Sequence, residues 1–243
     1  MTLEVIASTL IIVTAFFGEA VFGFGGGLIS IPLMTLLIGV KDAVSLILLF
    51  QFCMCLLIFK SYKQIDWQVA KPMTFTVAIG TIVGTFWLSR ASPKFLEEFL
   101  VFTILLFLIK SLWFNHFTFK NTKGALTAAI AGLGGGVISG AIGTGGPVIT
   151  MYLTESVKKK LQVRATLIYL FFVIGLVRIT VAIPEHLYSK YVLQLAIFAA
   201  LPFLVSIYFG QHIYKKVKDE YYGVGINILL AVSAIILIFK LLS

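Results

Sequence analysis

The sequence predicts an all-α integral membrane protein of about eight transmembrane helices in two four-helix repeats, each with a glycine-broken or re-entrant first helix. Three observations lead to this prediction: the chain has few charges, it contains long apolar runs, and a glycine cluster occurs twice. Only 12% of the 243 residues are charged and 60% are hydrophobic, whereas a soluble domain carries about 25% charged residues. So few charges cannot cover a surface that faces water, and we therefore expect the chain to lie in a lipid bilayer.

Charged residues divide the chain into apolar segments, and a helix needs about 20 apolar residues to cross a hydrocarbon core of about 30 Å. The first and fifth segments are longer than one crossing requires, and each contains a glycine cluster. We expect each of them to tilt, to break or to fold back, and the sequence leaves kinked spans and hairpins open as alternatives. The segments are residues 5–40, 43–59, 72–89, 95–114, 124–154, 165–184, 191–211 and 221–239.

The two glycine clusters align at an offset of 120 residues. Residues 23–30 read GFGGGLIS and residues 143–150 read GTGGPVIT, so three glycines, an aliphatic pair and a final hydroxyl residue coincide. Internal repeats of this kind are typical of transporters. We therefore predict a first four-helix repeat over residues 1–114, a linker over 115–123 and a second four-helix repeat over 124–243.

Contiguous glycines favour an unwound backbone, whereas glycines that only pack helices together are usually spaced by four residues. Irregular backbone inside a bilayer must lie within protein or along a wet cavity. A helix that restarts after such a break presents unpaired amide N–H groups and the positive end of its dipole, and both favour an anion. We therefore predict an anion site whose substrate-binding residues include Gly23, Gly25, Gly26, Gly27, Ser30, Gly143, Thr144, Gly145, Gly146 and Thr150.

Three polar residues inside the apolar segments extend this prediction. Arg178 either attracts the substrate anion or snorkels to the nearby interface. Gln51 either contacts the substrate or hydrogen-bonds a neighbouring helix. Glu19 precedes the first break by four residues, and it is our candidate for proton coupling. Pairing with Arg178 and contact with lipid headgroups are its alternative roles.

Other classes of function lack the residues that they require. The net charge of +9 comes from lysines in short loops, where they orient helices in the bilayer rather than bind nucleic acid. No histidine pair has metal-ligand spacing, and Cys53 and Cys55 would face different sides of a helix. We therefore expect no metal, no cofactor and no catalytic residues. The expected partners are a small anionic substrate and membrane lipid, and the oligomeric state is not predicted.

The chain resembles the TauE/SafE (TSUP) family of sulfite exporter-like membrane transporters. The resemblance rests on FGFGGGLISIPL at residues 22–33, GTGGPVI at 143–149, and the span entries VKDA at 40–43 and VRAT at 163–166. It implies transport of sulfur-containing anions such as sulfite, thiosulfate or small organosulfonates, and a location in a bacterial inner membrane. The chain departs from the family in one respect: asparagines found in the second span of many relatives are absent, and Gln51 stands near that place.

These observations together predict a secondary transporter or facilitator for a small sulfur oxyanion or sulfonate, with proton coupling through Glu19 and simple uniport both open. A transporter of another small organic anion is the first alternative. An anion channel and an intramembrane enzyme are less favoured. Paired breaks at repeat-related positions are typical of alternating access rather than of a passive channel, and an enzyme would need a nucleophile with a base or a metal cluster.

Overall fold

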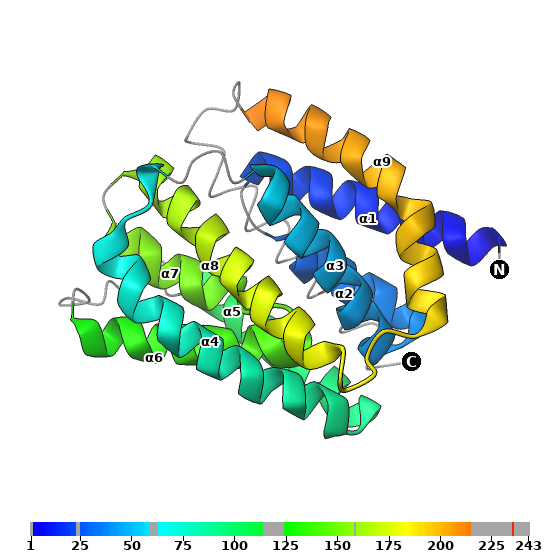
Figure 1. The fold of residues 1–243 in the computed structure, drawn as a ribbon, viewed down its shortest axis with the longest axis horizontal. Coiled ribbons are helices and arrows are strands. Elements are labelled where there is room, and N and C mark those ends of the chain that lie inside the picture. The colour runs from blue at the N-terminus through cyan, green and yellow to red at the C-terminus, as the bar shows by residue number, and fades with distance from the viewer. Residues whose placement is uncertain are drawn as a thin grey trace. The chain divides into compact units, whose positions relative to one another are not determined.

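The computed structural model describes residues 2–22, 25–58, 63–113, 124–157, 159–214 and 235, and the elements within them are helices (Figure 1). Six of these helices, namely α1, α3, α4, α6, α8 and α9, are long and apolar enough to cross a membrane. The prediction of an all-α membrane protein is therefore confirmed. The arrangement of eight spans in two repeats stays a prediction, and the apolar segment at 221–239 lies, apart from residue 235, outside the described residues. The helices are α1 (Thr2–Phe22), α2 (Gly26–Ile38), α3 (Val40–Ile58), α4 (Trp67–Arg90), α5 (Pro93–Trp113), α6 (Ala125–Ile142), α7 (Gly146–Ser156), α8 (Lys160–Ala182) and α9 (Lys190–Tyr214).

Both long apolar segments break at their glycine clusters. Between α1 and α2, Gly25 adopts a φ of 110°, and between α6 and α7, Gly143 adopts a φ of 71°. Both values lie in the left-handed region, which costs a residue with a side chain roughly 1–2 kcal/mol. Glycine avoids this cost. The breaks predicted from contiguous glycines are therefore confirmed as backbone features.

The chain folds into two compact units, and each unit draws helices from both halves of the sequence. The described parts of Met1–Phe50, Ser92–Asn115 and Leu187–Ser243 form the first unit, which holds α1, α2, the start of α3, α5 and α9. The described parts of Gln51–Ala91 and His116–His186 form the second unit, which holds the rest of α3 together with α4, α6, α7 and α8. Helices that are distant in sequence therefore make the packing contacts of each unit.

In the first unit, α9 lies along α1 in the same direction (Figure 1). The rings of Phe16 and Phe203 meet edge to face at 5.2 Å. One to two turns further along both helices, a Cβ added to Gly210 would lie 2.6 Å from the Cβ of Ala20. Phe50 joins the aromatic pair, with its ring 4.7 Å from that of Phe203. Bulky aromatic side chains therefore fill much of this interface.

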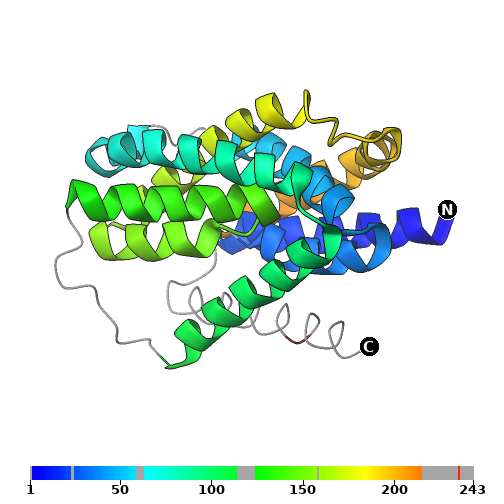
Figure 2. The ribbon, with the colours of Figure 1, turned by 90° about the horizontal axis from the view of Figure 1, so that it is seen from below.

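In the second unit, α4 and α6 also run in the same direction, and they pack through glycines (Figure 2). A Cβ added to Gly136 would lie 3.1 Å from the backbone nitrogen of Thr81, and one added to Gly140 would lie 2.9 Å from the Cα of Gly84. Glycines at four-residue spacing let two membrane helices approach closely. The glycines of this interface are Gly80, Gly84, Gly132, Gly136 and Gly140.

The short helix α7 folds back along α6, so the second broken segment is a hairpin. A Cβ added to Gly145 would lie 2.7 Å from the backbone nitrogen of Ser139, and one added to Gly135 would lie 2.6 Å from the Ile149 side chain. As residue numbers rise along α7, the residues that it contacts on α6 fall in number, so the two helices are antiparallel. With 11 residues, α7 is about 16 Å long, too short to cross the core. Of the two alternatives, the hairpin therefore holds for α6 and α7.

Candidate functional site

The first break carries a carboxylate from the chain itself. The backbone N–H of Gly26, the first residue of α2, donates to Oε2 of Glu19 at 2.9 Å. The Glu19 side chain is only 2% exposed. The start of a helix offers unpaired amides and the positive end of the dipole to an anion. In this structure Glu19 supplies that negative group to α2.

The neighbouring hydroxyl in the first break is also engaged. Ser30 donates its hydroxyl proton to the carbonyl oxygen of Gly26 at 2.5 Å, and Ser30 is fully buried. Gly27 is buried beside it in the first turn of α2. The amide of Gly26 and the hydroxyl of Ser30, both predicted substrate contacts, therefore already bond to groups of the protein. Gly23, the remaining predicted residue of this cluster, lies outside the described residues.

The second break presents buried hydroxyls that find no partner within the described part of the chain. Thr144 precedes the N-cap residue Gly145 of α7, and its side chain is 1% exposed. Its Oγ1, and that of Thr150 one turn into α7, make no hydrogen bond among the described residues. No side chain caps the start of α7. A buried polar group left unpaired costs about 1–3 kcal/mol. A ligand with acceptor atoms would remove this cost by accepting hydrogen bonds from the two hydroxyls.

Close packing surrounds the glycines of the second break. Gly145 lies against α6, where a Cβ would approach the backbone of Ser139. A Cβ on Gly146 would lie 3.0 Å from Cζ of Phe171 on α8. The N–H of Gly143 donates to the carbonyl of Ser139 at 2.9 Å and so ends α6. These glycines therefore allow α7 to begin against its neighbours, and its first-turn amides are the groups left to meet a ligand.

Arg178 lies on α8 beyond the start of α7. It follows Phe171 by seven residues, so both lie on one face of α8, about 10 Å apart along the axis. Because α7 runs opposite to α8, the step from Phe171 to Arg178 leads past the first turn of α7. The Arg178 side chain is 3% exposed, whereas a snorkelling side chain would extend its charged end to the membrane surface.

Gln51, midway along α3, is half-buried.

Comparison with known proteins identifies the family of the chain. A family model described as "Sulfite exporter TauE/SafE" matches residues 8–237. The chain belongs to the TauE/SafE family. No curated protein and no solved structure matches it. TauE/SafE is a family of transporters rather than enzymes, so the predictions of a multi-pass membrane transport protein and of no enzymatic activity are confirmed.

For this TauE/SafE protein, the predicted site residues fall into one group in each unit. The first group is Glu19 with the start of α2. The second is Thr144 and Thr150 at the start of α7, with Arg178 two turns further along α8 than Phe171, which contacts Gly146. Sequence reasoning missed Phe171, which covers Gly146, because nothing in the local pattern links α8 to this break. No cluster of three potential metal ligands occurs among the described residues.

Proposed function

We propose that this TauE/SafE protein is a secondary transporter or facilitator that moves a small sulfur oxyanion or organosulfonate across a bacterial inner membrane. The observation that carries the proposal is the pair of buried hydroxyls of Thr144 and Thr150 at the uncapped start of α7, which have no hydrogen-bond partner in the described ranges. Amide N–H groups and hydroxyls are donors without a full charge. They suit an oxyanion that must be bound and then released, because conduction requires binding that is not too tight.

In this proposal, the substrate anion binds between the start of α7 and Arg178. Each hydrogen bond to a charged group contributes about 1.5–3 kcal/mol, so two hydroxyls and the first-turn amides can hold an oxyanion in a desolvated site. The buried guanidinium two turns further along α8 adds a favourable charge without direct contact. The half-buried amide of Gln51 is a further candidate contact.

Glu19 is the proposed coupling group. Its carboxylate occupies the start of α2, which would otherwise offer the anion a second position besides the one at the start of α7. Protonation of Glu19 would weaken its bond with the Gly26 amide, because a neutral carboxyl group is a poorer acceptor than a carboxylate. A proton taken up by Glu19 would thus free the helix start. This links the protonation of one side chain to the binding of the anion.

The proposed internal repeat supports a transporter of the alternating-access type. At an offset of 120, α1 corresponds to α6, and at an offset of 126 the fourth helices α4 and α9 correspond to each other. The contact of Phe16 with Phe203 then matches that of Gly136 with Val77, and the contact of Ala20 with Gly210 matches that of Gly140 with Gly84. We therefore keep the repeats at 1–114 and 124–243, joined by the linker 115–123, as part of the proposal.

Flux measurements test the proposed function. The full-length protein is reconstituted into liposomes, and uptake of ³⁵S-labelled thiosulfate is followed with and without an imposed pH gradient. Uptake of a labelled short sulfonate is measured in parallel. We expect saturable uptake above that of protein-free liposomes. Uptake that is no faster than in protein-free liposomes for both anions, under both conditions, would reject the proposal.

A further inference from the structure

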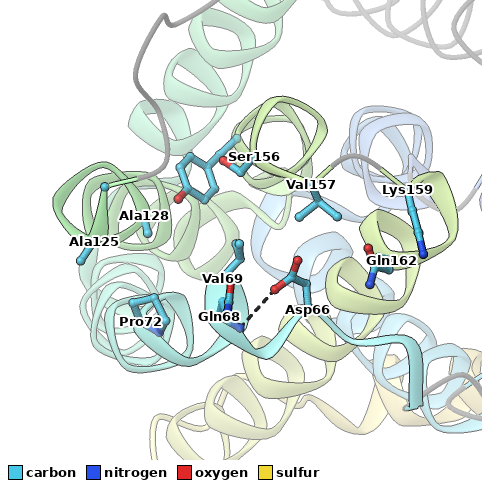
Figure 3. Close-up of a pocket in the computed structure, with 12 residues that line it drawn as sticks. Asp66, Gln68, Val69, Pro72, Ala125, Ala128, Ser156, Val157, Lys159 and Gln162 are labelled. Carbon is cyan, nitrogen blue, oxygen red and sulfur yellow. Dashed lines mark hydrogen bonds between the residues drawn. The ribbon is translucent and has the colours of Figure 1, made fainter.

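A second site lies in the second unit, far along the helices from the breaks. A cavity of about 490 Å³ opens where α4, α6 and α8 begin and α7 ends (Figure 3). Figure 3 shows Lys159 and Gln162 on one side of it and Ala125 and Ala128 on the other. None of the residues that line it belongs to the predicted transport site. The polar side chains of its lining are Asp66, Gln68, Tyr152, Ser156, Lys159 and Gln162.

Three parallel helices direct their N-terminal ends at this cavity. The packing glycines make α4 parallel to α6. The bonds of Asp66 with Thr166 and of Thr74 with Tyr169 make α4 parallel to α8. Each N-terminal end carries roughly half a positive charge. Three such ends of like sign repel one another, and an anion placed among them would offset that repulsion.

Two of these three helix starts have no side-chain cap. Asp66 caps α4 by accepting from the amide of Gln68 at 3.1 Å. The N-cap residues of α6 and α8 are Gly124 and Lys159, and neither provides a side-chain hydrogen bond. Both residues line the cavity. First-turn amides of α6 and α8 are therefore available as donors at its wall.

A buried tyrosine gives independent evidence for a ligand. Tyr152 is only 8% exposed, it lines the cavity, and it makes no hydrogen bond in the described structure. The hydroxyl oxygen of Ser156, one turn further along α7, is buried and likewise has no partner among the described residues. Buried polar atoms nearly always have a hydrogen-bond partner. The Ser156 oxygen is such an atom. Together with the Tyr152 hydroxyl in the wall of the cavity, it points to a bound polar group.

The charge balance of the lining favours a negative ligand. The carboxylate of Asp66 is engaged by the start of α4, and the exposed ammonium of Lys159 is the cation of the lining. We propose that this cavity binds a small oxyanion through the uncapped starts of α6 and α8, the Tyr152 hydroxyl and Lys159. The oxyanion is either a free ion or the phosphate of a lipid headgroup, because the cavity lies at the ends of membrane-crossing helices. Since it uses no residue of the proposed transport site, this inference does not depend on the proposed function.

Equilibrium binding to the purified full-length protein in detergent tests the site, with ³²P-labelled inorganic phosphate and ³⁵S-labelled thiosulfate as probes. Tyr152→Phe removes one hydroxyl, and we expect it to weaken binding of at least one probe about tenfold. Lys159→Gln removes an exposed charge, and we expect an effect of about threefold that shrinks as salt is added. Lys71→Gln is the matched control, because this exposed lysine of α4 does not line the cavity.

Nanodiscs separate the two sources of the oxyanion. Phosphatidylcholine discs with and without phosphatidic acid are compared for binding of labelled phosphate. Loss of binding in the phosphatidic acid discs assigns the cavity to a lipid headgroup, and retained binding assigns it to a free ion. Both results support the site. The site is rejected if neither probe binds in detergent, or if Tyr152→Phe and Lys159→Gln both bind as tightly as Lys71→Gln.

Discussion

The two broken segments α1–α2 and α6–α7 share a glycine break but differ in what occupies the start of the second helix. In the first segment, Glu19 accepts from the Gly26 amide, and Ser30 donates to a carbonyl of its own helix. In the second, Thr144 and Thr150 keep buried hydroxyls without partners among the described residues. The difference teaches that a broken helix is not by itself an open anion site.

One position accounts for much of this difference. At the offset of 120, the residue that corresponds to Glu19 is Ser139 on α6. Serine is neutral and short, and in the structure it lies against Gly145. A helix start beside a glutamate already has its anion, whereas one beside a serine does not. Both segments therefore break at glycines, but only the start of α2 has a carboxylate bound to it. The following predictions test that contrast.

The largest effect is expected from Gly145→Ala. A Cβ at this position would lie 2.7 Å from the backbone nitrogen of Ser139, and backbone atoms cannot move aside as a side chain can. We expect a loss of about 1–3 kcal/mol in the free energy of unfolding, seen as a lower melting temperature of the purified protein. Gly134→Ala is the control, because a Cβ there meets nothing within 4 Å. Equal melting temperatures for the two variants would show that α7 does not begin against α6.

Thr144→Val should raise the KM for thiosulfate uptake at least tenfold. The substitution keeps the shape of the side chain but removes a hydroxyl that we assign to a charged substrate, worth about 1.5–3 kcal/mol. The control is Thr154→Val on the exposed side of α7, where the hydroxyl donates to the carbonyl oxygen of Met151 at 3.0 Å. A KM for Thr144→Val that matches the control would remove this hydroxyl from the site.

Glu19→Gln should abolish the response of uptake to a pH gradient while transport without a gradient continues. Glutamine keeps an oxygen that can accept from the Gly26 amide, but it cannot take up or release a proton. Uptake by the variant and by the unsubstituted protein is compared with and without the gradient in liposomes. If the variant responds to the gradient as the unsubstituted protein does, Glu19 is not the coupling group.

Arg178→Gln should give the smallest change, a rise of roughly threefold in the KM for thiosulfate. A charge about 10 Å from the helix start acts through space and is partly screened. Arg90→Gln is the control, because Arg90 is exposed and pairs with Glu185 at 3.5 Å. An unchanged KM for Arg178→Gln would leave this buried guanidinium with a structural role.

The sequence predicted the features that depend on local backbone chemistry. The glycine-rich stretches allow the left-handed backbone that Gly25 and Gly143 adopt, and the chain breaks there. Contiguity alone does not cause a break, because Gly134–Gly136 remain helical within α6. The bond between Glu19 and Gly26 could also have been predicted from the sequence. The two residues lie on either side of a short turn, which brings them together. The sequence indicated Glu19 as a candidate for proton coupling, but the bond of Glu19 to the helix start was not predicted.

Features that depend on distant contacts could not be predicted in this way. The glycines of α4 and α6 are spaced by four, as helix packing favours, but the spacing does not name the partner helix. Nothing in one half indicates that α9 packs on α1 while α4 packs on α6. The cavity around Tyr152 forms from four helix ends that are far apart in sequence. Such sites become visible only once the tertiary arrangement is known.

The residues Thr150 and Ser30, which align at an offset of 120, offer the most direct test of the contrast between the two breaks. The measurement is the KM for saturable thiosulfate uptake by liposomes that contain Thr150→Val or Ser30→Ala. We predict a KM about tenfold higher for Thr150→Val, because its hydroxyl is free to meet the anion, and an unchanged KM for Ser30→Ala, whose hydroxyl already donates to Gly26. Equal effects of the two substitutions, or a larger effect of Ser30→Ala, would contradict the account.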